Sequence, residues 1–474
     1  MKKHVFPARI LATVVFFATW SGAQAPMVEP AGTVDSTAAP ALEALVASAL
    51  ERSPSLAALN ERLAAAQEMV TAAGALADPM VEVMLQDASF PKYTVGTMEM
   101  SMIGPEVRQA LPFPGKREAR RAVARAEAAI RTDELGQLRR QLVADVRSLY
   151  GGVYALDQER TALSAARELL DMLSATAAMR YSVGEAEQEA VIKAQLEVSR
   201  LEERSDDLEA ERSILVAALN RLLDQPGATP LGQVTALPPV DVPAQPWEDA
   251  VLASSAEVAV RRAAVTAAER RLSLLRLDLK PDFTTGAAVG LRGGFDPVVT
   301  LRFGVELPLW RKQKQQPMIR ATEHEMKMAQ AELREAEAAA RSEAARLQAD
   351  WQRADKQIVR YSEAVLPQSS AAVDAARSSY LAGRGDFSTV VEDFRMWLEA
   401  RSELARREAD RFRTWAELDA LLGEAPETGE PGSEARRPGT GDRGAGTEAR
   451  RPGSGSQGIQ GIAESRSEIH GGVR

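Results

Sequence analysis

The sequence contains no cysteine, and aromatic residues make up only 5% of its 474 residues. Without cysteine the chain cannot form disulfides, thiolate metal sites, a cysteine nucleophile or a lipid-modified N-terminal cysteine. Alanine, leucine, glutamate and arginine are abundant instead, and the hydrophobic share is 45%. This composition is typical of long helices and not of a compact core rich in aromatic side chains.

Histidine is also scarce, with three residues in the whole chain. His4 and His470 lie near the two ends, and His324 stands alone in a segment of helical pattern. The chain therefore has no histidine cluster for a metal ion and no Ser-His-Asp set, so we predict no enzyme activity, metal or cofactor. The net charge of -9 is spread over segments of mixed sign, and no basic face indicates nucleic-acid binding.

The N-terminus has the pattern of an export signal. Basic residues precede the apolar run 10–18, and small residues suited to cleavage follow it. A single membrane anchor is the alternative, but the apolar run is well short of the roughly 20 residues needed to span a bilayer. We therefore predict a signal peptide over residues 1–25, followed by an N-terminal linker over residues 26–40.

The C-terminal segment differs from the rest of the chain. From residue 425 to 474 glycine, proline and arginine abound, charges alternate, and no aromatic residue occurs. Such a segment cannot bury enough apolar area to offset its chain entropy. We predict a disordered tail over residues 425–474.

The remainder of the chain contains an internal duplication. Tyr181 and Gly184 of one Tyr-x-x-Gly motif return about two hundred residues later as Tyr380 and Gly383. Further pairs recur in the same order and at nearly the same spacing: Leu111-Pro112 with Leu307-Pro308, Lys116 with Lys312, and Pro79 with Pro281. This recurrence indicates tandem duplication of a whole structural unit. We predict a first repeat over residues 41–230 and a second over 231–424.

Each repeat is predicted to run helix, strand, strand, long helix, long helix. In the first repeat, residues 41–77 have helical apolar spacing with a break near Pro54, and residues 81–85 form a short strand-like run. Residues 116–180 contain no proline, and a continuous helix of that length would reach on the order of 100 Å. Residues 185–223 return without glycine or proline and keep the narrow apolar stripe of a coiled-coil seam.

The strands of the second repeat alternate more clearly. Residues 283–291 are followed by a Gly-Gly turn and then by apolar residues at every second position: Val299, Leu301, Phe303, Val305 and Leu307. Polar or small residues occupy the positions between them. Such alternation suits a strand between lipid and water, and it also suits a half-buried strand of a soluble sheet, which the pattern alone favours.

The number of strands helps to decide between a membrane strand and a strand of a soluble sheet. An isolated four-stranded sheet leaves both edges and an apolar face uncovered, whereas a membrane barrel must be closed and needs at least about eight strands. Four strands can therefore contribute to a barrel only if chains associate. We predict a mainly α fold with membrane β structure; a homotrimer would give a 12-stranded β-barrel continuous with a 12-helix α-barrel.

Over roughly residues 41–424 the sequence resembles the TolC-like outer-membrane efflux channels. The marks of the resemblance are the doubled unit, the two Tyr-x-x-Gly tips, the run at residues 307–310 (LPLW) and Pro367 inside a long helix. The resemblance implies a trimer in the outer membrane whose α-barrel extends into the periplasm. It also implies two partners, a periplasmic adaptor and a proton-driven inner-membrane pump, with the channel as the passive exit duct for drugs, metal cations or proteins.

Within that family, the motifs at residues 78–80 (DPM), 98–100 (MEM) and 111–116 (LPFPGK) look like those of the branch paired with heavy-metal exporters. The last motif also occurs in channels of unassigned substrate. Two alternatives stay open, a periplasmic adaptor and the channel of a type I protein secretion system. Adaptors usually carry one hairpin flanked by segments of many short strands, whereas this chain alternates two hairpins with two strand pairs.

The resemblance also implies a pore that narrows at the periplasmic tips, where acidic side chains surround the opening. The candidate gate residues are Asp386, Glu392 and Asp393, which three copies would bring together around a narrow pore that attracts cations. The alternative is a solvated helix start, where the helix dipole favours acidic residues.

Four tip residues have both a structural and a functional interpretation. Gly184 and Gly383 permit tight turns, and Tyr181 and Tyr380 are expected to pack across them. The resemblance adds that these tips contact the adaptor.

Trp310, at the end of the last strand, is predicted to lie at the membrane interface, with ordinary packing as the alternative. Five methionines (Met80, Met84, Met98, Met100 and Met102) could bind Cu(I), but apolar packing is the favoured interpretation.

Overall fold

The computed structural model of the protein describes residues 39–89, 91–184 and 187–423. The predicted signal peptide (1–25), most of the predicted linker (26–40) and the predicted tail (425–474) lie outside the described residues. The described chain is mainly helical and contains one four-stranded sheet. None of its helices is both long and apolar enough to cross a bilayer.

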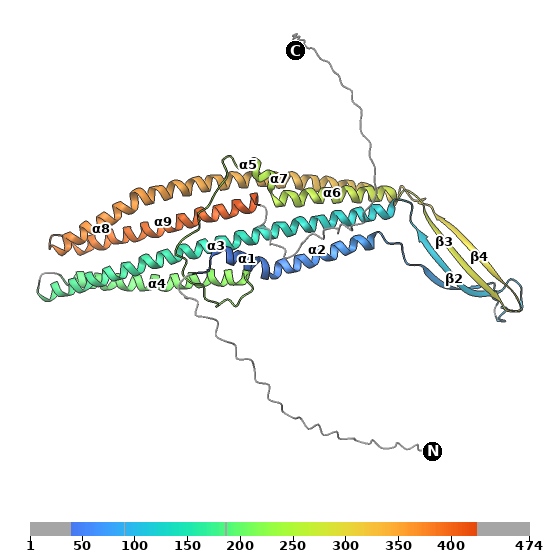
Figure 1. Ribbon diagram of the computed structural model, residues 1–474, viewed down its shortest axis with the longest axis horizontal. Helices are drawn as coiled ribbons and strands as arrows, with labels where there is room; N and C mark the ends of the chain where they lie inside the picture. Colours follow the sequence, from blue (N-terminus) through green and yellow to red (C-terminus); the bar gives the residue numbers. More distant parts are fainter. Residues whose placement is uncertain (1–38, 90, 185–186, 424–474) are drawn as a thin grey trace, which may run out of the picture. The chain divides into compact units, whose positions relative to one another are not determined.

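The first half of the described chain runs from two short helices through two strands into a long helical hairpin (Figure 1). Pro54 opens the second helix and accounts for the predicted break. The third helix has 67 residues, which corresponds to a length on the order of 100 Å. The elements are α1 (Leu42–Arg52), α2 (Pro54–Ala73), β1 (Met80–Gln86), β2 (Met102–Leu111), α3 (Lys116–Ser182) and α4 (Gln188–Leu222).

The second half repeats this order of elements, as the duplication indicated. Its long outgoing helix is divided into α7, a short π turn and α8, and α9 returns along it. The elements are α5 (Glu248–Ser254), α6 (Ala256–Leu277), β3 (Asp282–Arg292), β4 (Phe295–Glu306), α7 (Gln315–Arg360), η1 (Tyr361–Val365), α8 (Leu366–Leu381) and α9 (Phe387–Leu422).

The π turn accounts for Pro367 inside the long helical run. Proline lacks the N–H donor of a helical residue and its ring displaces the preceding turn, so a local widening lets the helix continue past it. Pro367 lies in the first turn of α8, directly after η1, and no residue of η1 is buried. The predicted long helix is therefore present, but it contains a π turn.

The four strands form one antiparallel sheet in the order β1-β2-β3-β4. Pairing between the two repeats is made by β2 and β3, so each repeat contributes one inner and one edge strand. Val81, Val107, Ala287 and Leu301 lie in one row across the sheet. Side chains of one row point to the same face, and this register therefore decides which residues share a face.

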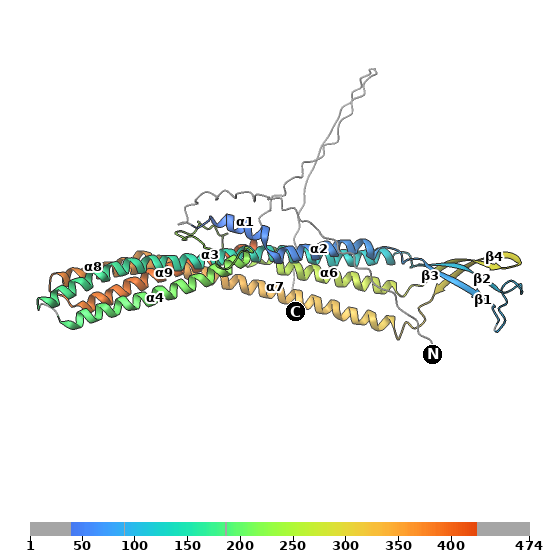
Figure 2. The ribbon, with the colours of Figure 1, turned by 90° about the horizontal axis from the view of Figure 1, so that it is seen from below.

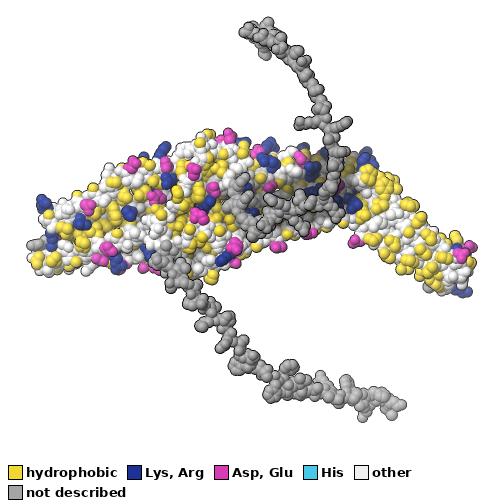
Figure 3. Space-filling view, in the orientation of Figure 1, with side chains coloured by type: hydrophobic (Ala, Val, Ile, Leu, Met, Phe, Trp, Pro, Cys, Tyr) yellow, Lys and Arg dark blue, Asp and Glu magenta, His cyan; other side chains and the backbone are white. Residues whose placement is uncertain are grey.

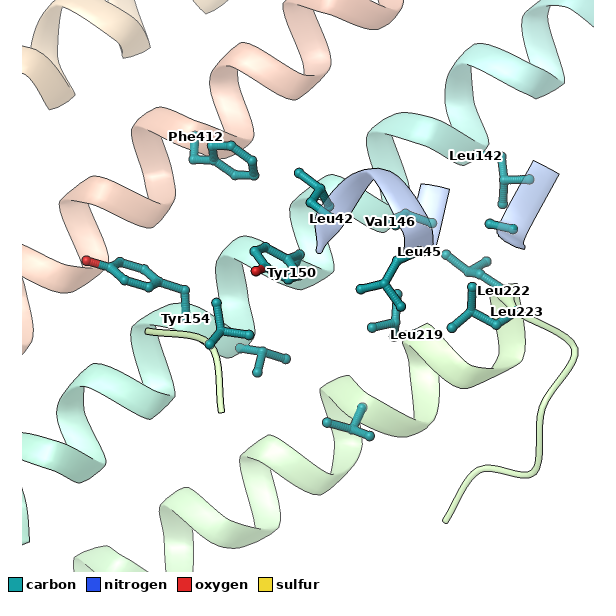
Figure 4. Packing of buried hydrophobic residues seen from close by; sticks show 14 of the residues in the cluster. Leu42, Leu45, Leu142, Val146, Tyr150, Tyr154, Leu219, Leu222, Leu223 and Phe412 are labelled. Carbon is teal, nitrogen blue, oxygen red and sulfur yellow. The ribbon is translucent and has the colours of Figure 1, made fainter. Parts of the chain in front are cut away.

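The helices are held together by α3, which packs against α2, α4, α6 and α9 (Figures 1 and 2). Figure 4 shows the largest buried cluster, in which Leu45 of α1 lies between Val146 of α3 and Leu219 of α4. A second cluster joins α3, α4, α8 and α9 toward the hairpin tips, and it includes Tyr380 and Phe387. A third cluster joins α7 and α9 around Trp247, Leu347 and Leu418.

A buried ion pair fixes the segment that follows α4. Asp157 of α3 is 1% exposed and accepts hydrogen bonds from Arg212 at 2.7 Å and from the backbone N–H of Val234 at 2.8 Å. Arg212 also donates to the main-chain carbonyls of Leu231 and Gly232. Because every charged group has a partner, this cluster can tie the segment to the helices despite its burial.

Candidate functional site

One face of the sheet is covered with exposed apolar side chains (Figure 3). The alternating residues predicted for the last strand belong to it, and Phe303 is 82% exposed. The register brings apolar residues of the other strands to the same face: Val81, Val83, Leu85, Val107, Val289 and Leu291. Soluble monomers rarely expose contiguous apolar surface of more than a few hundred Å². This face therefore requires an apolar surrounding.

The opposite face of the sheet carries a charged network. Glu82 and Glu106 lie directly across from one another, and Arg108 bridges them at 3.1 Å to each. Arg302 of β4 lies 3.3 Å from Glu106 and donates to the sulfur of Met84 on β1. The two faces thus differ as lipid-facing and water-facing walls do in a membrane sheet. In β4 the polar face is the one that the alternation predicted, and the register adds the charged residues of β1 and β2 to it.

The methionines of the first strand pair lie at positions open to water or on the polar face. Met80, Met84 and Met102 alternate with the apolar-face residues, and Met98 and Met100 are exposed in the loop between β1 and β2. Within the described residues, no cluster of His, Asp or Glu could hold a metal ion. The predicted packing role does not apply to Met80, Met98 and Met100, because these residues are 55%, 55% and 69% exposed.

Trp310 lies just beyond β4, and its side chain is 70% exposed. The backbone N–H groups of Gln313 and Lys314 donate to its carbonyl, so the chain turns here before α7 begins. Leu307 and Leu309 are exposed beside it. Ordinary packing therefore does not explain Trp310, which continues the apolar face toward the helices.

The two hairpin tips have the predicted turns but differ in their tyrosines. Gly184 and Gly383 have φ angles of 77° and 71°, in the left-handed region that glycine adopts without strain. Tyr380 is 4% exposed and packs edge-on against Phe387, at 5.6 Å between ring centres. Tyr181, in contrast, is 49% exposed, so the expected packing across the turn is wrong for the first tip. The sequence after Gly184 offers no aromatic residue corresponding to Phe387.

The tips are joined to each other by contacts that the sequence did not reveal. Arg180 of α3 donates to the main-chain carbonyls of Tyr380 and Leu381, at 2.7 Å and 2.8 Å. Lys193 of α4 donates to the hydroxyl of Ser388 at 2.8 Å. These pairs are about two hundred residues apart in the sequence, and no local pattern marks them.

One turn further along the helices, a buried carboxylate extends these contacts. Glu197 of α4 is 7% exposed and pairs with Arg395 of α9, and Arg200 lies 2.8 Å from the same carboxylate. Charge-assisted pairs of this kind restrain the two helices relative to each other, because a buried carboxylate is costly without its partners.

The three candidate acids are placed differently from one another. Asp386 is the N-cap of α9, and its side chain accepts a hydrogen bond from the N–H of Ser388, which supports the structural interpretation for this residue. Glu392 is exposed, and Asp393 is half-buried. Neither forms an ion pair with a residue that the structure describes. His324 is an exposed residue of α7, and the other two histidines lie outside the described residues.

Comparison with known proteins decides the family. The sequence profile described as "Outer membrane efflux protein" matches residues 45–225 and 247–424. The chain belongs to the outer membrane efflux protein family. As a member of this family it is an outer-membrane efflux channel that extends into the periplasm, and not an enzyme. The predicted resemblance and channel function are thereby confirmed, and the adaptor alternative is wrong.

Solved structures share the fold of this efflux protein. VceC of Vibrio cholerae is similar with a TM-score of 0.68 at 19% identity, over 81% of this chain and 96% of VceC. CusC has a TM-score of 0.71 at 16% identity, over 84% and 95% of the two chains. MtrE of Neisseria gonorrhoeae has a TM-score of 0.62 at 17% identity, over 84% and 94%. Sequence comparison with curated proteins gives no match. At these identities the likeness establishes the fold and leaves the substrate open.

Proposed function

We propose that three copies of this chain form the exit duct of a tripartite efflux system, passive in itself and driven by an inner-membrane pump. The observation that supports the trimer is the sheet, which combines an exposed apolar face with two free edges. β1 and β4 are edge strands, and each leaves a row of backbone N–H and C=O groups without a partner in the sheet.

Lipid cannot satisfy these edges. In hydrocarbon each unpaired backbone group costs several kcal/mol, so a sheet in a membrane must close on itself. Four strands are too few to close, but β4 of one copy can pair with β1 of the next, because the two edges then run antiparallel. Three copies close a 12-stranded barrel, with the charged network of Glu106 and Arg302 toward the lumen and Phe303 toward lipid.

The hairpin tips are the proposed contact with the periplasmic adaptor. Around Gly184 and Gly383 several apolar side chains are exposed, although the helices behind them are well packed: Met179, Tyr181, Val183 and Leu381. An adaptor that covers these side chains would gain roughly 25 cal/mol for each Å² of apolar surface removed from water. Tyr380 contributes by shaping the second tip, since its ring is buried behind the turn.

The proposed gate lies at the start of α9. Glu392 supports this proposal best, because it is exposed and forms no ion pair within the described residues. Asp386 holds the helix start, and Asp393 lies beside Glu392. Three copies would place these carboxylates around one opening, where they would attract cations and repel one another. An opening of this charge favours metal cations or cationic drugs as cargo.

The trimer and its membrane location are tested together. The full-length protein is extracted from outer membranes in detergent, sized by light scattering and reconstituted in a planar bilayer. We expect a trimer that conducts ions. A soluble periplasmic monomer would contradict the proposal.

A further inference from the structure

The loop between β1 and β2 presents methionines at the end of the sheet that lies away from the helices (Figure 1). Met98 and Met100 are 55% and 69% exposed, and Met102 opens β2 two residues later. The backbone N–H of Ser101 donates to the carbonyl of Met98, so a turn brings residues 98 and 101 close together. Three thioethers therefore belong to one short folded segment, and none of the roles proposed above uses them.

Buried hydroxyl groups hold this loop in place. Thr94 and Ser101 are 6% and 1% exposed, and their hydroxyl oxygens lie 2.8 Å apart. The Ser101 hydroxyl also donates to the carbonyl of Asp87 at 2.7 Å, which joins the end of the loop to its beginning. The methionines are thus exposed on a loop whose shape is fixed by its own hydrogen bonds.

The loop lies on the polar side of the sheet. Arg292 is the last residue of β3 and follows Gly290, on the polar face, by two positions. Its guanidinium donates to the carbonyl of Glu99 at 3.2 Å. Glu99 stands between Met98 and Met100 in the sequence, so this contact holds both methionines toward the polar side. In the proposed barrel the polar side is the lumen, and the loop then lies at its outer mouth.

The thioether of Met102 is held on the same side. A Cβ at Gly290 would overlap the sulfur of Met102, so the glycine leaves the thioether its place. Met84 lies on the same face, but its sulfur already accepts a hydrogen bond from the Arg302 guanidinium. Met80 lies at the other end of β1. The cluster thus comprises the two loop methionines and Met102.

The ligand chemistry of this cluster is narrow. Thioethers are soft, uncharged ligands that suit Cu(I), whereas Zn²⁺ without thiolates depends on imidazole and carboxylate groups. The part of the chain that the structure describes offers no group of His, Asp or Glu able to hold such an ion. The carboxylate of Glu99 adds a negative charge beside the thioethers, at 4.0 Å from Arg292. A soft monovalent cation is therefore the ligand that fits the cluster.

We propose that Met98, Met100 and Met102 bind Cu(I) at the outer mouth of the channel. The proposal rests on the efflux function proposed above and names its cargo, a soft monovalent cation that meets this cluster last on its way out. A conducting site must bind its ion weakly enough to let it leave, and neutral thioethers meet this condition better than charged thiolates do. A closed barrel would carry one such cluster from each copy around its mouth.

The test uses the full-length channel in detergent, with Cu(I) kept reduced under anaerobic conditions and shared with a chromophoric Cu(I) chelator. We expect about one Cu(I) ion per chain, which an excess of Zn²⁺ does not displace. The double variant Met98→Leu, Met100→Leu keeps the size of both side chains but removes two ligands, so its affinity should fall at least roughly tenfold. Met80→Leu is the matched control, because Met80 is as exposed as Met98 but lies at the far end of β1, and it should bind as the wild type does.

Two further measurements make the result specific. Because the chain has no cysteine, sulfur neighbours in the X-ray absorption spectrum of bound copper can come only from methionine, and we expect to find them. Met102→Leu removes the third ligand without altering the loop, and it should weaken binding as well. Unchanged affinity in the double variant, or copper with only nitrogen and oxygen neighbours, would overturn the proposal.

The same preparations are sized and reconstituted in planar bilayers, so the cluster and the efflux function can fail separately. A conducting trimer that does not bind Cu(I) contradicts the cluster alone. A protein that binds Cu(I) but neither assembles nor conducts contradicts the efflux function. The double variant should conduct potassium as the wild type does, because leucine in place of methionine leaves the duct intact.

Discussion

The guanidinium of Arg180, at the end of α3, lies over the ring of Tyr380 at 5.1 Å and donates to the carbonyl of the same residue at 2.7 Å. One side chain of the first repeat thus holds the tip of the second by both a hydrogen bond and a cation–π contact. The two tips of one chain are therefore coupled, and motion of α8 and α9 away from α3 must break this pair.

Replacing Arg180 should release the second tip. In Arg180→Ala we expect faster amide hydrogen exchange over residues 378–386 and a higher single-channel conductance, because α8 and α9 lose an attachment to α3. Arg384→Ala is the matched control, since Arg384 is exposed at the same tip and forms no side-chain hydrogen bond or ion pair within the described residues. Unchanged exchange in Arg180→Ala would contradict a restraining role.

Glu392 should determine the preference of the pore for cations. Glu392→Ala removes one charge per copy from the proposed opening, and we expect the cation-to-anion permeability ratio to fall by at least about twofold. The reversal potential in a salt gradient measures this ratio. Glu203→Ala removes an exposed acid from α4 and should leave the ratio unchanged. Equal ratios in the two variants would exclude Glu392 from the gate.

The two faces of β4 should respond in opposite ways to the same change. Leu301→Arg places a charge on the apolar face, and near the centre of a bilayer this costs about 2–4 kcal/mol per copy. We expect less of this variant in the outer-membrane fraction. Thr300→Arg places the same side chain on the polar face, in the row of Glu106, and should insert normally. Equal insertion of both variants would argue against a lipid-facing sheet.

Asp157 should stabilise the fold more than an exposed acid does. Asp157→Asn leaves the largely buried Arg212 without its charge partner, so the free energy of unfolding should fall by about 3–5 kcal/mol. Asp171→Asn breaks an exposed pair with Arg167 and should cost about 0–1 kcal/mol. Urea unfolding followed by circular dichroism measures both, and similar losses would contradict the special role of Asp157.

Tyr154 should make stability fall at alkaline pH. Burial, and then a 2.6 Å hydrogen bond to Glu408, raises the pKa of Tyr154 above its ordinary value of 10.0. Below pH 10 the hydroxyl is protonated in both folded and unfolded chains, so its contribution is fully present there. Above pH 10 the unfolded chain ionises first, which favours unfolding. We expect the wild type to lose stability relative to Tyr154→Phe as pH rises above 10; parallel curves would show that Tyr154 is not the cause.

Local patterns predicted most of the fold. The break at Pro54, the strands around residues 81–85 and 299–305, and the turns at Gly184 and Gly383 all appear where the sequence placed them. Each depends on neighbours in the chain: a missing N–H, alternation of side chains, or a positive φ angle. The interruption of the long helix at η1 was not predicted, because a helix can accommodate a proline such as Pro367 by a kink, a break or a π turn, and the sequence pattern does not choose among them.

The candidate site was predicted less completely, for a related reason. The tip motifs and the acids of α9 were found because they recur or cluster in the sequence. Arg180, Lys193 and Glu197 were missed because their partners lie in the other repeat. The prediction that Tyr181 and Tyr380 both pack across their turns was wrong for Tyr181. The burial of such a tyrosine depends on whether a ring such as Phe387 lies behind the turn.

The sequence alone thus determined the duplication, the class and order of the elements, and the alternation that makes one face of the sheet apolar, because these are properties of residues close together in the chain. Only the tertiary structure decided which charges neutralise one another and which stay unpaired. Lys116 and Lys314 look alike in the sequence, yet Lys116 is buried against Asp282, whereas Lys314 is exposed and forms no ion pair within the described residues. That distinction arises because the two repeats meet at β2 and β3, which no local pattern specifies.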